Sequence, residues 1–274
     1  MNNKSTFYFD SNKKNKLYFK EILNYKDLFY SLAWREFKVR YAQTFLGFAW
    51  AFLQPIATLI IFFFVFGKAI KVDTGNIPYP VFALTGLTVW SYFSFVISTA
   101  GRSIITESAM IKKIYFPRLV IPLSKALVGL IDFAISFVLL VCAMLYYQIP
   151  VTLNLFWSPI FLMLILVVSV GVGIWISALS IRFRDVQHII PFFIQIGLYA
   201  TPVAYSSAVI PEQYQLFYHL LNPLAGVIEG FRWCMIGGEI NFNYLIYSII
   251  IILIIFISSI FYFRKVEKVM ADII

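Results

Sequence analysis

The chain has 274 residues, of which 61% are hydrophobic and only 13% are charged, whereas soluble domains usually carry about 25% charged residues. A chain with so much apolar surface cannot hide it from water, so the composition excludes a soluble protein and predicts an integral membrane protein. The formal net charge is +9. Basic residues beside membrane spans set topology and contact anionic lipids, so we expect membrane lipids and no nucleic acid as partners.

The N-terminal part is expected to lie outside the membrane core. Residues 1–24 are polar and aperiodic, which predicts a cytoplasmic tail, and we expect no cleavable signal peptide because no apolar core precedes Tyr25. Residues 25–44 are predicted to form an amphipathic helix. The aromatic residues Tyr30, Trp34, Phe37 and Tyr41 recur along it every three or four positions, and Phe45, directly after it, continues the pattern. With basic residues flanking this face, the pattern is typical of a helix that lies flat at a membrane surface.

Six further segments are apolar and long enough to cross a bilayer, which takes about 20 helical residues. They cover approximately residues 45–66, 81–101, 119–147, 156–180, 189–205 and 244–263. The fifth of these spans is interrupted by Pro191 and Pro202. In the fourth, Ser169, Gly173 and Ser177 repeat every four residues, and such a stripe of small residues predicts the close approach of another helix.

Two of the connecting segments have helical character of their own. Residues 106–115 are predicted to form two or three helical turns on the cytoplasmic side, ended by Pro117. Between residues 206 and 243, the segments QYQLFYHLL and PLAGVIEGFRWCMI are each shorter than a span. We expect them to form two re-entrant half-helices in the extracytoplasmic face, buried by other parts of the protein.

The distribution of basic residues predicts the topology. An even number of spans places both termini on one side of the membrane. With the N-terminus in the cytoplasm, all but three of the 22 basic residues lie on the cytoplasmic side, the exceptions being Lys68, Lys71 and Arg232. This satisfies the positive-inside rule. The sequence therefore predicts an all-α integral membrane protein with six transmembrane helices and both termini in the cytoplasm.

The residues that usually carry chemistry are sparse. His188 and His219 are expected on opposite sides of the bilayer, and Cys142 and Cys234 lack the spacing of a metal or redox site. The chain contains no GxSxG and no GxxxxGK[ST] phosphate loop. We therefore expect a protein that is not an enzyme and that binds no metal, ATP or other cofactor itself.

Asp132 is the one acidic residue well inside a predicted span. Because a carboxylate near the middle of the membrane costs about 2.5–3.5 kcal/mol on insertion scales, it should face the helix bundle. It either bonds to a neighbouring helix or a basic group, which we favour, or forms a polar point in a conduit or a proton site. Lys125 lies two turns away and is expected to extend toward the cytoplasm.

Aromatic residues make up 19% of the chain. Trp and Tyr side chains within the spans, such as Trp50, Trp90, Tyr92 and Tyr199, offer flat apolar faces with a polar edge, which suits the passage of sugar rings. Anchoring at the membrane interface explains such residues equally well. The pattern alone leaves both interpretations open.

Four blocks of sequence resemble the permease subunits of ABC-2 type exporters of polysaccharides, namely of O-antigen, teichoic acid and capsule. The blocks are WREFKVRYAQTFLGFAWAFLQP (34–55), KKIYFPRLVIPLS (112–124), RDVQHIIPFFIQIGLYATPVAYSSAVIP (184–211) and NPLAGVIEGFRW (222–233). The resemblance implies a homodimer in the bacterial cytoplasmic (inner) membrane that exports lipid-linked polysaccharide. It also implies two copies of a separate P-loop ATPase subunit, which binds ATP and Mg. Residues 45–263 would be the transmembrane domain, and 264–274 a cytoplasmic tail.

The resemblance also implies roles for individual residues. The helix over residues 25–44 would be a gate helix at which the substrate is admitted, with the residues Trp34, Arg35, Phe37, Lys38, Arg40 and Tyr41. The helix of residues 107–115 would couple to the ATPase through Glu107, Met110, Lys112, Lys113 and Tyr115. The candidates for the conduit lining are Trp50, Tyr92, Phe193 and Tyr199. The half-helices would cap the outer mouth.

The basic residues of the gate helix have two possible roles. Arg35, Lys38 and Arg40 could bind the phosphate or pyrophosphate of a lipid-linked sugar chain, or they could hold the helix at anionic headgroups. Alternatives to polysaccharide export are an ABC-2 exporter of small lipophilic compounds and a stand-alone membrane-embedded transferase or flippase. An ion channel would require a filter or a ring of charge, which the sequence does not show.

Overall fold

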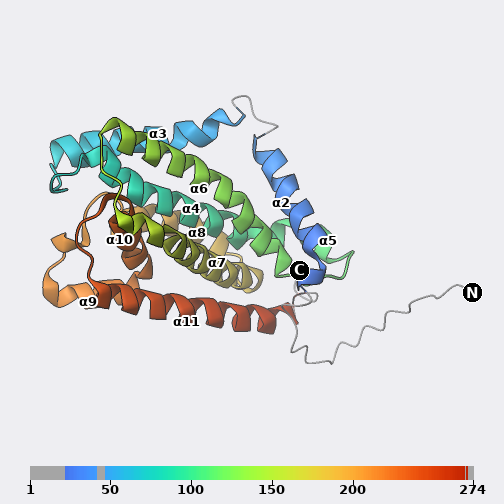
Figure 1. The fold of residues 1–274 in the computed structure, drawn as a ribbon. Coiled ribbons are helices and arrows are strands. Elements are labelled where there is room, and N and C mark those ends of the chain that lie inside the picture. Colours follow the sequence, from blue (N-terminus) through green and yellow to red (C-terminus); the bar gives the residue numbers. More distant parts are fainter. Residues whose placement is uncertain (1–21, 42–46, 269, 271–274) are drawn as a thin grey trace, which may run out of the picture.

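The computed structural model describes residues 22–41, 47–268 and 270, and all regular structure among them is helical (Figure 1). The helices are, in chain order, α2 (Lys26–Tyr41), α3 (Ala49–Phe62), η1 (Phe63–Ala69), α4 (Tyr79–Thr106), α5 (Ser108–Ile111), α6 (Val120–Tyr146), η2 (Leu153–Trp157), α7 (Ser158–Arg182), α8 (Val186–Ala200), η3 (Ser207–Val209), α9 (Glu212–Leu221), α10 (Pro223–Ile236) and α11 (Phe242–Glu267). The predicted tail of residues 1–24 lies largely outside the described residues, and so does Phe45, directly after the predicted amphipathic helix.

Five helices are long and apolar enough to cross a membrane, and they coincide with five of the six predicted spans. They are Ala49–Ala69, Tyr79–Thr106, Val120–Tyr146, Leu153–Arg182 and Phe242–Glu267. The fifth predicted span differs, because α8 has only 15 residues and reaches about 22 Å at a rise of 1.5 Å per residue. Helix α8 ends at Ala200, and the next residue, Thr201, is extended and precedes Pro202. A residue before proline is disfavoured in a helix, which explains why α8 stops here.

Helix α4 forms the centre of the bundle. Of its most apolar stretch, 78% is buried, against 11% for the corresponding stretch of α3. Helix α4 packs against α6 and α7, and α7 packs in turn against α11. The predicted stripe of small residues makes the α4–α7 approach possible: a methyl group added at Gly173 would lie 3.2 Å from Cβ of Ala100 and 3.4 Å from Cγ1 of Val96.

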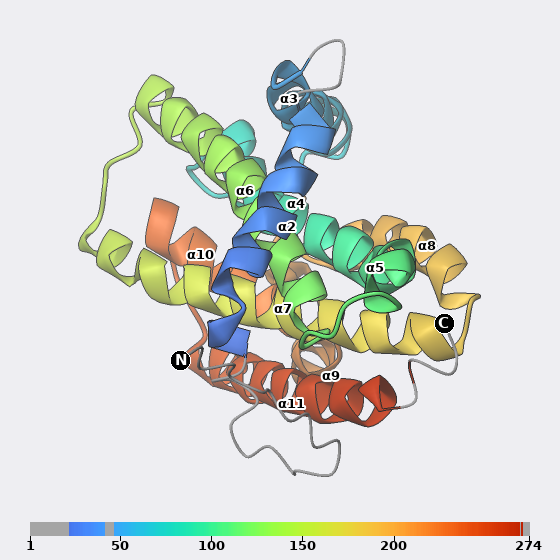
Figure 2. The same ribbon diagram turned by 90° about the vertical axis from the view of Figure 1, so that its right-hand side faces the viewer.

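The short helices lie at opposite ends of this bundle (Figures 1 and 2). Helices α2 and α5 lie at one end, which we call the α2 end, and α9 lies at the other, which we call the α9 end. Helix α11 finishes at the α2 end, where Glu267 accepts a hydrogen bond from the backbone N–H of Arg118 at 2.9 Å. The two segments predicted as half-helices form helices α9 and α10, with 10 and 14 residues.

The predicted helix over residues 106–115 is much shorter than expected. Helix α4 continues to Thr106, Glu107 leaves the helical conformation with φ −94° and ψ 15°, and α5 forms a single turn of four residues. Residues Ile114 and Tyr115 are non-helical and exposed. The physical reason is local: Pro117 disfavours helix at Phe116, and the adjacent Lys112 and Lys113 are exposed without the apolar side needed to pack another turn.

Candidate functional site

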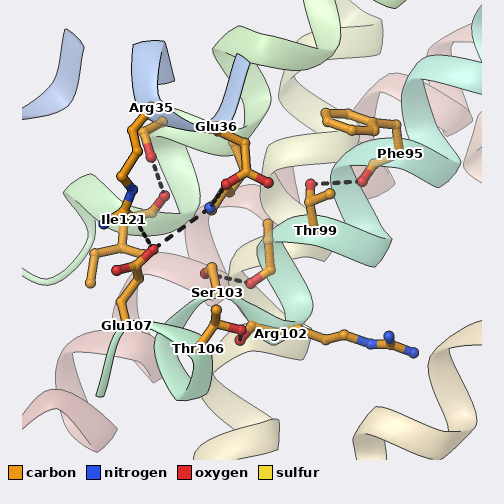
Figure 3. Close-up of polar contacts among 12 residues, drawn as sticks. Arg35, Glu36, Phe95, Thr99, Arg102, Ser103, Thr106, Glu107 and Ile121 are labelled. Atoms are coloured by element: carbon orange, nitrogen blue, oxygen red, sulfur yellow. Dashed lines mark hydrogen bonds and ion pairs between the residues drawn. The ribbon is translucent and has the colours of Figure 1, made fainter. Parts of the chain in front are cut away.

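Helix α2 is attached to the bundle by a cluster of four ionised side chains, Arg35, Glu36, Glu107 and Lys125. Figure 3 shows Arg35 reaching from α2 toward Glu107, which directly follows α4, and Glu36 lying beside them. Arg35 donates to Glu107, and Lys125 of α6 donates to Glu36. The Lys125 ammonium also lies 3.9 Å from Glu107. We call this set the ion-pair cluster, and it joins α2, α4 and α6.

Two of the four side chains of the ion-pair cluster are buried, so each of them requires a partner of opposite charge. The side chains of Glu107 and Lys125 are only 9% and 6% exposed, and an ionised group removed from water needs a charged partner and hydrogen bonds. Lys125 directs its buried ammonium toward α2, the helix that the sequence places on the cytoplasmic side. Glu36 supplies the partner, and sequence reasoning missed it because a glutamate on an amphipathic surface helix normally faces water.

A second contact fixes the end of α2. Arg40 pairs with Asp132 at 2.7 Å, the Tyr41 hydroxyl also donates to Asp132, and the Arg40 guanidinium lies 4.2 Å from the ring centroid of Phe95. Burial, followed by the bond to Asp132, raises the pKa of the Tyr41 hydroxyl well above its usual range, so the hydroxyl keeps its proton and donates. The interpretation that we favour for Asp132, a bond to a neighbouring helix or to a basic group, agrees with these contacts.

The aromatic residues of α2 are divided between its exposed side and the side that packs on the bundle. Tyr30 and Trp34 are exposed, whereas Tyr41 is buried. Trp34 and Phe37 stack with centroids 5.3 Å apart, and together with Tyr30, Ala33 and three apolar residues of α6 they line a hollow of about 390 Å³. Lys38 is exposed, and its ammonium lies 5.3 Å from the Trp34 ring centroid.

The predicted coupling residues separate into two groups. Glu107 is turned inward and belongs to the ion-pair cluster, as described above. Lys112, Lys113 and Tyr115 are exposed on the loop after α5, and Met110 is half-buried. Only the four-residue helix α5 separates this loop from Glu107 and its contact with α2.

A polar groove of about 520 Å³ runs between α3, α4, α6 and α8. We call it the hydroxyl groove, and its polar lining consists of Arg40, Gln54, Thr58, Ser91, Ser94, Ser98, Thr99, Asp132 and Ser136. Ser94 and Thr99 donate to backbone carbonyls of their own helix at 3.1 and 2.8 Å, which leaves their oxygen lone pairs as acceptors. The sequence analysis did not predict this groove. A pattern that indicates it is present, because Ser91, Ser94 and Ser98 share one helical face.

The predicted aromatic conduit residues do not behave alike. Trp50 on α3 and Phe193 and Tyr199 on α8 are exposed at 54%, 47% and 58%. Tyr92 is fully buried, and its hydroxyl donates to the carbonyl of Ala126 at 3.2 Å. A conduit residue must face an open surface, so the position of Tyr92 is that of a core residue. Trp90, by contrast, contributes to the hydroxyl groove.

Comparison with known proteins identifies the family. Among the residues that the structure describes, no group of three His, Cys, Asp or Glu side chains could hold a metal ion. The family model for the ABC-2 type transporter matches residues 27–236. The chain belongs to the ABC-2 type transporter family. The matched region of this ABC-2 protein runs from α2 to α10 and includes the ion-pair cluster and the Arg40–Asp132 pair.

Curated relatives cover most of the ABC-2 chain. The O-antigen export system permease protein RfbA of Klebsiella pneumoniae is 29% identical over 249 residues, which are 90% of this chain and 95% of that protein. The RfbA protein of Myxococcus xanthus is 29% identical over 215 residues, 78% and 82% of the two chains. The polysialic acid transport protein KpsM of Escherichia coli is 26% identical over 213 residues, 76% and 80% of the two chains.

Proposed function

We propose that the chain is the membrane permease of an ATP-driven exporter of lipid-linked polysaccharide. The observation that carries this proposal is the similarity, over at least three quarters of the chain, to permeases named for O-antigen export and polysialic acid transport. The hydroxyl groove supports it, because hydroxyl and amide side chains match the hydrogen-bonding groups of sugars. An exporter of small lipophilic compounds would not need hydroxyl and amide groups, such as those of Gln54, Thr58 and Ser91, along its route.

Two copies of the chain are proposed to form the conduit. Helix α3 buries little of its apolar surface within one subunit, and it borders the hydroxyl groove together with α8. The exposed Trp50, Phe193 and Tyr199 lie on these same two helices. A second copy facing α3 and α8 would cover this surface and close the groove into a channel with polar and aromatic walls.

The proposed topology places the α2 end in the cytoplasm of the cell, in the inner membrane of a bacterium. The distribution of basic residues supports this, since α2 and the loop after α5 carry Arg35, Lys38, Lys112 and Lys113. Both α2 and the end of α11 lie at that end of the bundle (Figure 1). Helix α8, with the turn after it, would serve as a sixth span, and α9 and α10 would be re-entrant from the outer side.

We propose that export is driven by ATP hydrolysis in two copies of a separate ATPase subunit, which binds ATP and Mg. The exposed loop of Lys112, Lys113 and Tyr115 offers the docking surface. Movement of this loop changes the position of Glu107, and Glu107 holds Arg35 of α2. The ATPase would therefore move the gate helix itself, and not only the spans, as far as the difference in contacts between nucleotide states allows.

Lys38 is the residue of α2 best placed to contact the phosphate of a lipid-linked substrate. Arg35 and Arg40 are paired with Glu107 and Asp132, whereas Lys38 is exposed and is paired with none of the acidic residues in the described parts of the chain. We expect Lys38→Glu to reduce export about five-fold, the effect of one exposed charge-assisted contact worth about 1 kcal/mol. Lys26→Glu, at the other end of α2, is the matched control. Equal export by the two variants would remove Lys38 from substrate binding.

Larger apolar side chains in the hydroxyl groove test whether the polymer passes through it. The double variant Ser94→Leu/Ser98→Leu is expected to reduce the amount of polymer at the cell surface about ten-fold, which corresponds to about 1.4 kcal/mol in the barrier to passage. Met163→Leu, on the exposed side of α7, should have no effect. Normal export by a double variant that is present in the membrane at the wild-type level would place the conduit elsewhere.

The proposed function as a whole is tested by reconstitution. The chain should co-purify with a P-loop ATPase, and lipid-linked glycan added to the complex in lipid vesicles should stimulate ATP hydrolysis. Deleting the chain should remove polymer from the cell surface while its lipid-linked form accumulates inside. Transport or modification of the glycan by the chain without any ATPase would contradict the proposal and favour a stand-alone flippase or transferase.

A further inference from the structure

A second polar cavity lies at the α9 end, far from the ion-pair cluster. It has a volume of about 560 Å³ and is formed by the turn at Ser206–Ala208, by α9 and α10, and by the start of α11. The side chains that line it include Gln215, Glu229, Trp233, Glu239, Asn243 and Tyr244. Its volume lies in the range of about 300–1,000 Å³ that is typical of small-ligand sites. We call it the outer cavity, and neither the hydroxyl groove nor the α2 contacts use it.

Glu229 is held in place as an acceptor in this cavity. The backbone N–H of Ser207 donates to one carboxylate oxygen of Glu229 at 3.1 Å, and the other oxygen lies 3.7 Å from Nε2 of His219. His219 is fully buried, and burial lowers its pKa although Glu229 acts in the opposite direction, so the neutral imidazole is favoured. A carboxylate offers about four acceptor positions, and most of those on Glu229 are therefore available to a ligand.

Arg232 also borders the outer cavity, but its guanidinium is used by the protein. It donates to Thr85 Oγ1 at 3.1 Å and to the carbonyls of Pro202 and Val203 at 3.1 and 3.3 Å. The Phe82 ring centroid lies 3.7 Å from the guanidinium carbon. Arg232 thus ties α10 to α4 and to the turn after α8. With Glu229 and Glu239 both on the wall, the cavity disfavours an anionic ligand.

Aromatic and amide side chains complete the wall. Trp233 and Phe242 meet edge to face with centroids 6.1 Å apart, and Tyr244 stacks on His219 with centroids 4.9 Å apart. The amide of Gln215 donates to the carbonyl of Ile210 at 3.0 Å, which leaves its own carbonyl oxygen as an acceptor. Flat apolar rings beside carboxylate and amide groups match a sugar, which has apolar C–H faces and a rim of hydroxyl groups.

We propose that the outer cavity binds a short segment of neutral sugar residues of the polymer after it has crossed the membrane. The proposal rests on the proposed function and topology, which supply the polymer and place the α9 end outside. Glu229 and Glu239 would accept hydrogen bonds from sugar hydroxyls, and Trp233 would contact the face of a ring. Such a site would hold the emerging chain outside and oppose its return between transport steps.

The test measures protection of a single cysteine. Asn243→Cys is introduced into a chain that also carries Cys142→Ser and Cys234→Ala, because Asn243 is exposed at the cavity wall. The purified protein in lipid nanodiscs is treated with a membrane-impermeant maleimide. The probe is the host cell's own polymer, released from its lipid by mild acid. We expect the polymer to slow the reaction several-fold, and Trp233→Ala or Glu229→Gln to abolish this protection.

Controls separate the sugar site from the proposed function. Tyr214→Ala, on the exposed side of α9, should keep the protection. Equal reaction rates with and without polymer, or protection that persists in both cavity variants, would overturn the site. Export by the same cysteine chain is measured in parallel, so that this outcome is distinct from a loss of transport. If in intact cells the cysteine reacts only after permeabilisation, the proposed outer placement is wrong, and the sugar site with it.

Discussion

Replacing Glu107 with glutamine is expected to reduce export about ten-fold while ATP hydrolysis by the complex continues. Glu107 bonds to Arg35 of α2 and lies 3.9 Å from Lys125 of α6, next to the loop that we propose as the ATPase docking surface. Removing its charge weakens the connection between that loop and the gate helix. A coupling free energy of about 1–3 kcal/mol between two sites corresponds to about 5–150-fold, so ten-fold is a moderate expectation.

The Glu107 variant should fold, which makes the effect interpretable. Lys125 keeps Glu36 as its partner, and the Arg35 side chain is 50% exposed, so water can solvate it. The measurement is polymer export and ATP hydrolysis by the reconstituted complex, for Arg35→Met, Glu107→Gln and the double variant. If the two residues act through one contact, the double variant should be no worse than either single variant.

Lys26→Met is the matched control for charge removal on α2, because Lys26 is exposed at the start of the helix. It should leave export and hydrolysis unchanged. Additive losses in the Arg35–Glu107 double variant would show that the residues act independently and would contradict the proposed transmission through α2. A parallel fall of hydrolysis and export would instead place Glu107 in the docking of the ATPase.

Arg40→Met is expected to give the largest loss of stability. It removes the cation paired with Asp132, whose side chain is 12% exposed and lies in the middle of the membrane-crossing helix α6. Breaking a buried ion pair by removing one partner costs about 3–5 kcal/mol, because the remaining charge is left uncompensated. Arg40 is itself 32% exposed, so we expect about 2–3 kcal/mol here after discounting for solvation.

The measurement is the thermal unfolding midpoint of the purified chain in detergent. The double variant Arg40→Met/Asp132→Asn should recover most of the loss, because the neutral amide removes the unpaired charge and still accepts a bond from Tyr41. Arg184→Met, in the exposed turn between α7 and α8, should not change the midpoint. If Arg40→Met unfolds at the wild-type temperature, the Arg40–Asp132 pair does not hold α2 in place.

Together the two substitutions separate two functions of the same helix. The ion-pair cluster at Glu107 links α2 to the segment that would receive movement, whereas the Arg40–Asp132 pair fixes the other end of α2 beside the hydroxyl groove. The first should affect coupling more than stability, and the second should affect stability more than coupling. A helix held at two points in this way can pivot about the Asp132 end when Glu107 moves.

The predictions that depend on local composition agree with the structure. Long uncharged stretches have to cross the membrane as helices, because lipid offers no partner for backbone polar groups. Four of the six predicted spans match helices α4, α6, α7 and α11 closely, and the first matches α3 with η1. The position of Asp132 inside a span also required a partner in the bundle. These conclusions follow from the sequence alone because they depend on the transfer of apolar and polar groups into lipid and not on which helices contact one another.

Tertiary structure alone decided which residues those contacts bring together. Nothing in the spacing of Glu36, Glu107 and Lys125 indicates that they meet, since they come from three helices separated by about 18 to 89 positions in the chain. Tyr92 is an aromatic residue of the type expected in a conduit, but its side chain is buried and its hydroxyl bonds to α6. The outer cavity likewise forms only because α9, α10 and α11 come together. Periodicity reports which face of one helix is apolar, whereas the partner of a polar side chain depends on how separate helices cross, and that is set by packing.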